Sequence, residues 1–175
     1  MLNNIILIGF MGSGKSRLAK DFSKKIGINI IDTDNIIESI EKKEIKDIFS
    51  ENGEQYFRDM EQLVANWIQD DLKNTLISSG GGFHKVININ QLGRVVFIDS
   101  SFENILKHLE KKSEFSKRPL YTDKKSLKEL YDKRRIEYIQ AAYETIKVDL
   151  YTDEENINRL LEIHEYDIIQ KKEDN

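Results

Sequence analysis

The chain has 175 residues, of which 39% are hydrophobic and 33% charged, a composition that fits one globular domain with a buried core. The net charge of -4 argues against a dedicated DNA- or RNA-binding protein, and the absence of cysteine excludes disulfide scaffolds, cysteine zinc sites and thiol catalysis. No apolar run approaches the roughly 20 residues that span a bilayer, and the N-terminus does not have the pattern of a signal peptide. We therefore expect a cytoplasmic protein with neither a membrane nor a nucleic acid as partner.

Apolar runs alternate with helical patterns along the chain. This alternation predicts crossover connections, and therefore a parallel sheet with helices on both faces. Residues 112–125 are rich in lysine and arginine, contain the only proline and lack apolar periodicity, so we expect a long exposed loop there. The expected strands are 4–8, 29–32, 75–79, 94–99 and, more weakly, 147–151, and the expected helices are 16–25, 35–43, 54–73, 101–111, 124–146 and 154–169.

A phosphate-binding motif follows the first expected strand. The sequence from Gly9 to Ser16 matches G-x-x-x-x-G-K-[ST]. Glycines let the backbone approach an anion closely, and successive N–H groups together with a helix N-terminus can then surround phosphates. In this motif Lys15 reaches the β- and γ-phosphates, and the Ser16 hydroxyl ligates Mg²⁺. The alternative is a glycine-rich turn without a nucleotide, which the flanking strand and helix make less favourable.

A second glycine cluster, Gly80-Gly81-Gly82, follows the third expected strand. Ligands in open α/β sheets bind at the carboxyl ends of the strands, so we expect a ligand or a side chain to approach the backbone here. The alternative interpretation is a flexible exit from the strand.

Carboxylates close two of the expected strands. Asp99 ends one strand, and Asp32 ends another and is followed by Thr33-Asp34. Asp32 and Asp34 are two residues apart and can point the same way, so one could hold a hydrated metal ion while the other accepts a proton from a substrate. The alternatives are that Asp34 caps a helix starting near Asn35 and that Asp99 caps the helix after it.

The expected helix 54–73 presents one apolar face, on which we expect Trp67 to be part of the core. Arg58 can pair with Glu61 along the helix, or it can clasp an acidic substrate through its bidentate fork. The apolar residues with this spacing are Phe57, Met60, Val64, Trp67 and Ile68.

Taken together, these motifs resemble the shikimate kinase family, whose fold is that of the nucleoside-monophosphate kinases. The resemblance covers about residues 3–163, and four of its five motifs belong to the acceptor site rather than to ATPases in general. The motifs occur in the order Gly9 to Ser16, Asp32-Thr33-Asp34, Phe57-Arg58-Asp59-Met60-Glu61, Gly80-Gly81-Gly82 and Arg118-Pro119-Leu120.

The resemblance implies a three-layer α/β/α fold around a five-stranded parallel sheet of order 2-3-1-4-5. It implies a single kinase domain over residues 1–175. Within that domain the core comprises 1–32, 62–111 and 125–165, the substrate-binding region is 33–61, the lid is 112–124, and a charged tail covers 170–175.

The implied reaction transfers the γ-phosphoryl group of ATP to the 3-hydroxyl of shikimate in aromatic amino-acid biosynthesis, with Mg²⁺ as cofactor and a monomer as the active form. The implied catalytic residues are Lys15, Asp34 as the base, and Arg118 from the lid. Nucleotide contacts are implied for Gly12, Ser13, Gly14, Lys15, Ser16, Arg17, Lys111, Arg118 and Asp153. Substrate contacts are implied for Asp34, Arg58, Gly80, Gly81, Gly82 and Arg134, and metal contacts for Ser16 and Asp32.

The chain departs from the family pattern at three places, one of which is the turn Thr152-Asp153-Glu154-Glu155-Asn156 near the last strand, where the family usually has a proline beside the adenine. The segment from Arg134 to Tyr138 lacks the usual proline, and the adjacent Arg135 leaves open which arginine meets the substrate carboxylate. The arginine that packs on adenine has its counterpart in Lys111 or in Lys107. A gluconate kinase, a nucleoside monophosphate kinase and a nucleotide-binding switch without catalysis are the alternative functions.

Overall fold

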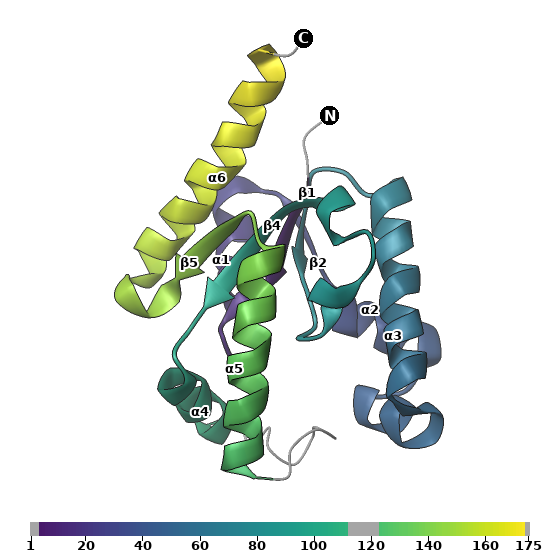
Figure 1. Cartoon of the computed structure of the whole chain (residues 1–175). Coiled ribbons are helices and arrows are strands. Elements are labelled where there is room, and N and C mark those ends of the chain that lie inside the picture. The colour runs from purple at the N-terminus through teal and green to yellow at the C-terminus, as the bar shows by residue number, and fades with distance from the viewer. Residues whose placement is uncertain (1–3, 112–122, 174–175) are drawn as a thin grey trace.

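The computed structural model describes residues 4–111 and 123–173, and the side chains of 4–110 and 123–165 (Figure 1). Five parallel strands form one sheet in the order β2-β3-β1-β4-β5, which confirms the predicted topology. The strands are β1 (Asn4–Ile8), β2 (Asn29–Asp32), β3 (Thr75–Ser78), β4 (Gly93–Asp99) and β5 (Glu144–Lys147). The helices are α1 (Lys15–Ile26), α2 (Thr33–Glu41), α3 (Ile45–Asp71), α4 (Phe102–Lys111), α5 (Lys124–Ala141) and α6 (Asp153–Glu173).

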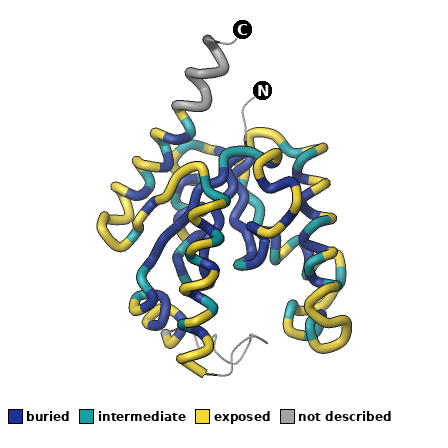
Figure 2. The backbone as a smooth tube through the Cα atoms, viewed as in Figure 1, coloured by how far each residue is buried: buried dark blue, intermediate teal, exposed yellow. Residues whose placement is uncertain are grey.

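The sheet is buried on both faces, as the alternation of side chains along β1 shows. Ile6 and Ile8 pack in a cluster with residues of α2, α3, α4 and α5, while Ile5 and Leu7 pack in a second cluster with residues of α1 and α6. Successive strand residues point to opposite faces, so a strand buried on both sides is apolar throughout. This is why β1 reads as a continuous apolar run and why the central strands of the sheet are mostly dark blue in Figure 2.

A buried asparagine ties three segments together at the amino end of the sheet. The Asn4 side chain donates to the carbonyls of Leu72 and Leu92 at 2.9 and 3.0 Å, and its Oδ1 accepts the backbone N–H of Thr75 at 3.1 Å. These bonds satisfy a buried amide and align β1 with β3 and with the start of β4. The opposite, carboxyl ends of the strands point toward α4 (Figure 1).

Two predicted boundaries are wrong. The last strand covers Glu144–Lys147 rather than 147–151, where a 3₁₀ turn at Val148–Leu150 follows instead. β5 is an edge strand in which only Ile146 is buried, so it carries no apolar run that sequence reading could find. For the same reason the preceding helix, expected to reach residue 146, ends at Ala141.

The third helix also differs from its prediction. It is interrupted at Gly53, whose φ of 82° and ψ of 174° are not helical, so the part after Gly53 begins where the helix 54–73 is predicted, and the part from Ile45 to Asn52 is an addition to the prediction. Trp67 is 38% exposed, so the prediction that it belongs to the core is wrong. At about 100° per residue, Trp67 falls at the edge of the stripe formed by Phe57, Val64 and Ile68.

Two predicted features fall wholly or partly outside what the structure describes. Most of the expected lid, residues 112–122, is outside the described chain, and so are the side chains of the expected tail 170–175. Within the described part of the chain, no helix has the length and apolar character needed to cross a membrane.

Candidate active site

The phosphate loop joins the end of β1 to the start of α1. Gly12 and Gly14 have φ values of 77° and 92°, a region that side-chain-bearing residues rarely adopt, and Gly14 caps α1. The Lys15 ammonium donates to the carbonyls of Gly9 and Phe10 at 2.8 and 2.9 Å. The loop therefore curls around its own lysine, and the N-terminus of α1 faces the space where phosphates would lie.

A pocket of about 340 Å³ opens beside this loop at the carboxyl ends of the strands. It brings together predicted nucleotide, metal and acceptor residues that are far apart in the sequence. Its walls are Met11, Gly12, Gly14, Lys15, Ser16, Arg17, Asp32, Asp34, Ser79, Gly80, Gly81, His108 and Leu109.

One corner of the pocket has the chemistry of a magnesium site. The Ser16 hydroxyl lies 3.2 Å from Asp32 Oδ2 and 3.0 Å from the Ser78 hydroxyl. Asp32 and Ser78 are register partners at the ends of β2 and β3, so the sheet itself sets this geometry. Hydroxyl and carboxylate oxygens suit Mg²⁺, which is commonly held by one or two protein groups together with phosphates and waters.

The geometry favours Asp32 over Asp99 at this corner. Asp99 accepts two bonds from Arg135, at 3.0 and 2.7 Å, and does not line the pocket. Sequence reading missed Ser78, because its role depends on its register opposite Asp32 and not on a motif.

Asp34 lies in the first turn of α2 and is not its cap. Asp32 is the N-cap residue, since its side chain accepts the Asp34 backbone N–H at 3.1 Å. The alternative interpretation of Asp34 as a cap is therefore wrong. Its carboxylate is instead directed at Gly80, where a β-carbon would overlap it.

Each glycine of the 80–82 segment leaves room for a different functional side chain. A β-carbon on Gly80 would overlap the Asp34 carboxylate, and one on Gly82 would overlap the Arg58 guanidinium. On Gly81 it would lie 3.2 Å from a terminal nitrogen of Arg134. These glycines have ordinary negative φ values, so they are needed for space and not for conformation.

Arg58 is held against this segment by two glutamates of its own helix. It donates to Glu54 at 2.8 Å and to Glu61 at 2.5 Å, and Glu61 is almost fully buried. Desolvation raises the pKa of Glu61, although the charge of Arg58 acts in the opposite direction. The predicted pairing along the helix is therefore confirmed, and the guanidinium also lies against Gly82, whereas its contact with an acidic substrate stays a prediction.

The two adjacent arginines of α5 point in different directions. Arg135 pairs with Asp99, whereas Arg134 is 5% exposed and faces Gly81. The Nε of Arg134 is buried and has no hydrogen-bond partner within the described residues. A buried guanidinium with one unsatisfied nitrogen beside a pocket favours an anionic ligand there.

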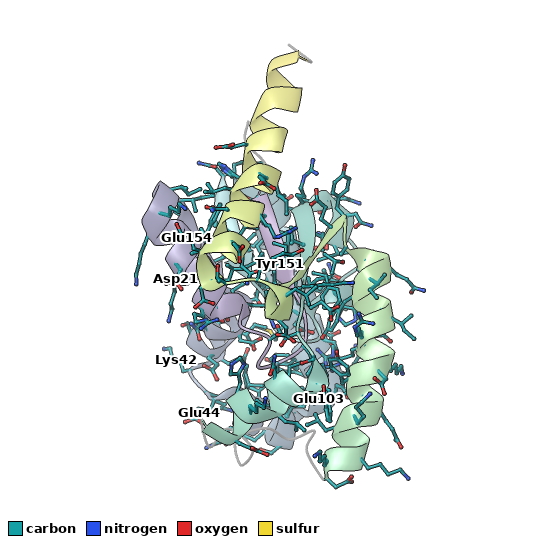
Figure 3. The ribbon with its side chains drawn as sticks, turned by 90° about the vertical axis from the view of Figure 1, so that its left-hand side faces the viewer. Asp21, Lys42, Glu44, Glu103, Tyr151 and Glu154 are labelled. Carbon is teal, nitrogen blue, oxygen red and sulfur yellow. The ribbon has the colours of Figure 1, made fainter. Side chains whose placement is uncertain are left out.

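A smaller cavity of about 60 Å³ adjoins the phosphate loop on its other side. Arg17 and Asp153, both predicted nucleotide contacts, line it and form an exposed ion pair of 2.6 Å. Asp21 lines it too, and Figure 3 views the molecule from this side, with Asp21 on α1 and Glu154 at the start of α6.

His108 lines both cavities, and it is the residue that sequence reading missed on the nucleotide side. Its Nδ1–H donates to the Gly12 carbonyl at 3.0 Å, which joins α4 to the phosphate loop. The expected counterpart was Lys111 or Lys107. Lys107 is exposed and lines neither cavity, and the side chain of Lys111 lies outside the description, as does Arg118.

Comparison with known proteins gives one consistent family. The family model described as shikimate kinase matches residues 11–165. A shikimate kinase of Helicobacter hepaticus is 40% identical over 137 residues, covering 78% of this chain and 81% of that protein. One of Persephonella marina is 39% identical over 145 residues, covering 80% and 86%.

Solved structures agree with this match. The shikimate kinase of Aquifex aeolicus superposes with a TM-score of 0.76 at 30% identity, covering 95% of this chain and 98% of that one. The Acinetobacter baumannii enzyme, solved in complex with shikimate, gives a TM-score of 0.82 at 26% identity, covering 98% and 96%. With this fold, this phosphate loop and these relatives, the chain belongs to the shikimate kinase family.

Proposed function

We propose that this protein transfers the γ-phosphoryl group of ATP to the 3-hydroxyl of shikimate, a step of aromatic amino-acid biosynthesis. One observation carries the proposal beyond family membership. Two arginines from separate helices, Arg58 and Arg134, lie against a segment of three glycines beside a phosphate loop, and Asp34 lies against the first glycine of that segment. That arrangement suits a small anion that carries hydroxyl groups.

On the acceptor side, the carboxylate of shikimate would pair with Arg58 and Arg134. Charge-assisted bonds to two guanidinium groups from different helices fix both the position and the orientation of the acceptor. Asp34 would accept the proton of the 3-hydroxyl as that oxygen bonds to the γ-phosphorus. The bond between this phosphorus and the β–γ bridging oxygen breaks, and ADP leaves with that oxygen.

On the donor side, the backbone N–H groups of Gly12 to Ser16 and the Lys15 ammonium would hold the phosphates. Arg17 and Asp153 would lie near the nucleoside, in the smaller cavity. Ser16 and Asp32 would hold Mg²⁺, which neutralises phosphate charge when bound. Lys15 then stabilises charge that develops on the phosphates during transfer.

The remaining assignments rest on the resemblance alone. We propose that residues 33–61 form the substrate-binding region and that 112–124 form a lid whose Arg118 reaches the phosphates, with Lys111 beside the nucleotide. We further propose that the protein acts as a monomer in the cytoplasm. Gel filtration at assay concentration tests the monomer, and replacing Arg118 with Ala should lower kcat about 100-fold or more if it meets transition-state charge.

The first test is a coupled measurement of ADP release from MgATP. Release should require shikimate and should stay at background with gluconate or with nucleoside monophosphates. Release with one of the other acceptors would replace the proposed substrate while keeping the kinase assignment. ATP binding without acceptor-dependent release would indicate a nucleotide-binding switch.

The second test separates acceptor binding from donor binding. Arg58→Ala should raise the shikimate KM about 10- to 100-fold, because a hydrogen bond to a charged group contributes about 1.5–3 kcal/mol. The ATP KM should change less than about twofold, since Arg58 does not line the nucleotide cavity. Lys73→Ala, an exposed cation at the far end of α3, is the matched control. An unchanged shikimate KM in Arg58→Ala would contradict the proposed acceptor site.

A further inference from the structure

A buried histidine outside the proposed reaction connects the glycine segment to α5. His84 lies in the 3₁₀ turn Phe83–Lys85, directly after the glycines, and its side chain is 3% exposed. Its Nε2 is 2.9 Å from Glu137 Oε2 on α5. Burial lowers the pKa of His84 to about 4, against the opposing effect of Glu137. At neutral pH the ring is therefore uncharged and donates its Nε2–H to the carboxylate.

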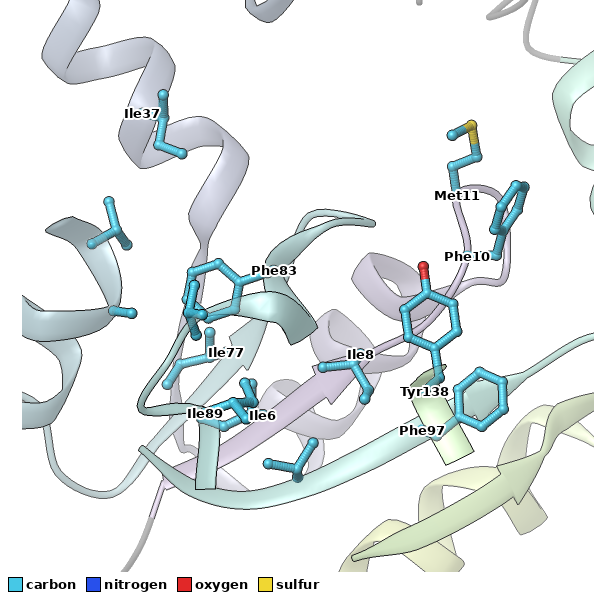
Figure 4. Close-up of a cluster of buried hydrophobic side chains, with 14 of the residues drawn as sticks. Ile6, Ile8, Phe10, Met11, Ile37, Ile77, Phe83, Ile89, Phe97 and Tyr138 are labelled. Atoms are coloured by element: carbon cyan, nitrogen blue, oxygen red, sulfur yellow. The ribbon is translucent and has the colours of Figure 1, made fainter. Parts of the chain in front are cut away.

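A second contact links the same two elements. The ring of Tyr138 meets the His84 ring edge-on, with centroids 4.5 Å apart, and its hydroxyl donates to the Gly81 carbonyl at 2.6 Å. Figure 4 shows the Tyr138 ring among core side chains, with its hydroxyl directed away from Phe97. Burial raises the pKa of Tyr138, which keeps this phenol protonated and able to donate.

Arg134 belongs to the same stretch of α5 as these contacts. Glu137 and Tyr138 follow it by three and four residues, the spacing that places side chains on one face of a helix. Its guanidinium lies against Gly81, yet its Nε makes no hydrogen bond to any described residue. Arg134 also interacts with the Tyr138 hydroxyl, so the position of its guanidinium depends on how this stretch of α5 is attached to the turn.

We propose that His84 and Glu137 form a positioning pair, which fixes α5 against the glycine segment so that Arg134 meets the acceptor in one defined place. The inference rests on the proposed function, because it assumes that Arg134 binds the acceptor. Neither member of the pair lines the pocket, so both act through Arg134 and Gly81. Lys85, 3.4 Å from Glu137, is half-exposed and forms an ion pair with this carboxylate.

Because His84 is uncharged, its contact with Glu137 is a hydrogen bond and not an ion pair, and two substitutions of Glu137 distinguish these interpretations. Glu137→Gln keeps an oxygen that accepts the Nε2–H, so its shikimate KM should stay within about twofold of the wild type. Glu137→Ala removes the acceptor and should raise the shikimate KM about 3- to 10-fold, the range for one hydrogen bond. The kcat and the ATP KM should change less than about twofold in both variants.

His84→Phe tests the other partner of the bond. It keeps an aromatic ring against Tyr138 but removes the N–H, and it should reproduce the rise in shikimate KM seen in Glu137→Ala. Because the two substitutions break the same bond, the shikimate KM of the double variant should be no higher than that of either single variant. Lys85→Ala is the matched control and should leave the shikimate KM within about twofold.

Three results would overturn the positioning pair. One is a Glu137→Gln variant as impaired as Glu137→Ala, which would mean that the charge matters and not the bond. Another is a double variant in which the increases in shikimate KM of the two single variants multiply. The third is a His84→Phe variant whose shikimate KM does not rise. If the wild-type protein releases no ADP with shikimate, the proposed function fails instead. Shikimate binding followed by calorimetry then tests the pair directly, with the same order of affinities expected.

Discussion

At the scale of single residues, the proposed acceptor site depends on three glycines, whose lack of a side chain leaves room for other groups. Gly80, Gly81 and Gly82 are each in contact with a different functional group, and none needs glycine for its backbone angles. The site therefore uses empty volume to bring an aspartate and two arginines to one segment. A motif shows that something approaches these glycines, but only the packed structure shows what does.

Adding one methyl group to this segment should impair acceptor binding. In Gly82→Ala the new β-carbon would overlap the Arg58 guanidinium, which must then move. We expect the shikimate KM to rise at least about tenfold, equivalent to about 1.4 kcal/mol, with little change in the ATP KM. Ile87→Ala, at a 91% exposed position in the same connection, is the control. Wild-type kinetics in Gly82→Ala would show that Arg58 is free to move aside without loss.

The buried His84 should make folding stability depend on pH. Its pKa is near 6.5 when exposed and about 4 in the folded protein, so the unfolded chain binds the extra proton first as the pH falls. Its contribution is complete above about pH 6.5 and is lost progressively toward pH 4, by about 3 kcal/mol in total. The free energy of unfolding of the wild type minus that of His84→Phe, both from urea unfolding, should fall between pH 7 and pH 5. A constant difference would mean that His84 titrates alike in both states.

At the scale of elements, sequence reading succeeds where burial is complete. The predicted bounds of β1, β3 and β4 agree with the structure to within a residue, because their apolar runs are buried. Those of β2 agree as well, although its residues are only partly buried. Sequence reading failed at β5, where a single residue is buried, and at Trp67 on the edge of a helical stripe. Those positions are decided by neighbours in space, which local periodicity does not encode.

The site divides in the same way. Motifs identified Lys15, Asp32, Asp34 and Arg58, all of which lie at or beside the pocket. Ser78, which is set by strand register, and His108, which is set by how α4 packs on the phosphate loop, carry no local signal. What escaped sequence reading was therefore tertiary geometry rather than residue chemistry.

The kink in α3 gives a prediction at this scale. Gly53 combines a φ of 82° with a ψ of 174°, a combination available to glycine and strained for other residues by about 1–3 kcal/mol. Gly53→Ala should lower the Tm by about 2–12 °C, at about 2–4 °C per kcal/mol for a protein of this size. Asn52→Ala, at the exposed neighbouring position, should change the Tm by less. Equal Tm values for the two variants would show that the kink relaxes without strain.

At the scale of the whole molecule, the candidate site lies at the carboxyl ends of the strands, and the hydrogen bonds of Asn4 lie at their amino ends. The pocket is lined by residues that follow β1, β2 and β3, so a ligand bound there should stabilise the fold as a unit. Each ligand at about 100 times its Kd adds about 2.7 kcal/mol to the free energy of unfolding.

This coupling gives a measurable shift. Shikimate at about 100 times its Kd should raise the Tm by about 5–11 °C in a thermal melt. In Arg58→Ala the same shikimate concentration should give a clearly smaller shift, while the shift with MgATP should persist. If shikimate stabilised both proteins equally, its binding would not involve Arg58.

The sheet order also has a consequence for how the chain is made. β1 is the first strand to be synthesised and the central one in the sheet, yet its partners β3 and β4 are not complete until Ser78 and Asp99. At about 5–20 residues per second, ribosomes need on the order of 5–20 s to travel from Ile8 to Asp99. During that time the five residues of β1 lack the two strands that pair with them in the folded sheet. The central strand is therefore unpaired on both of its edges until Ser78 has been made, and on one edge until Asp99 has been made.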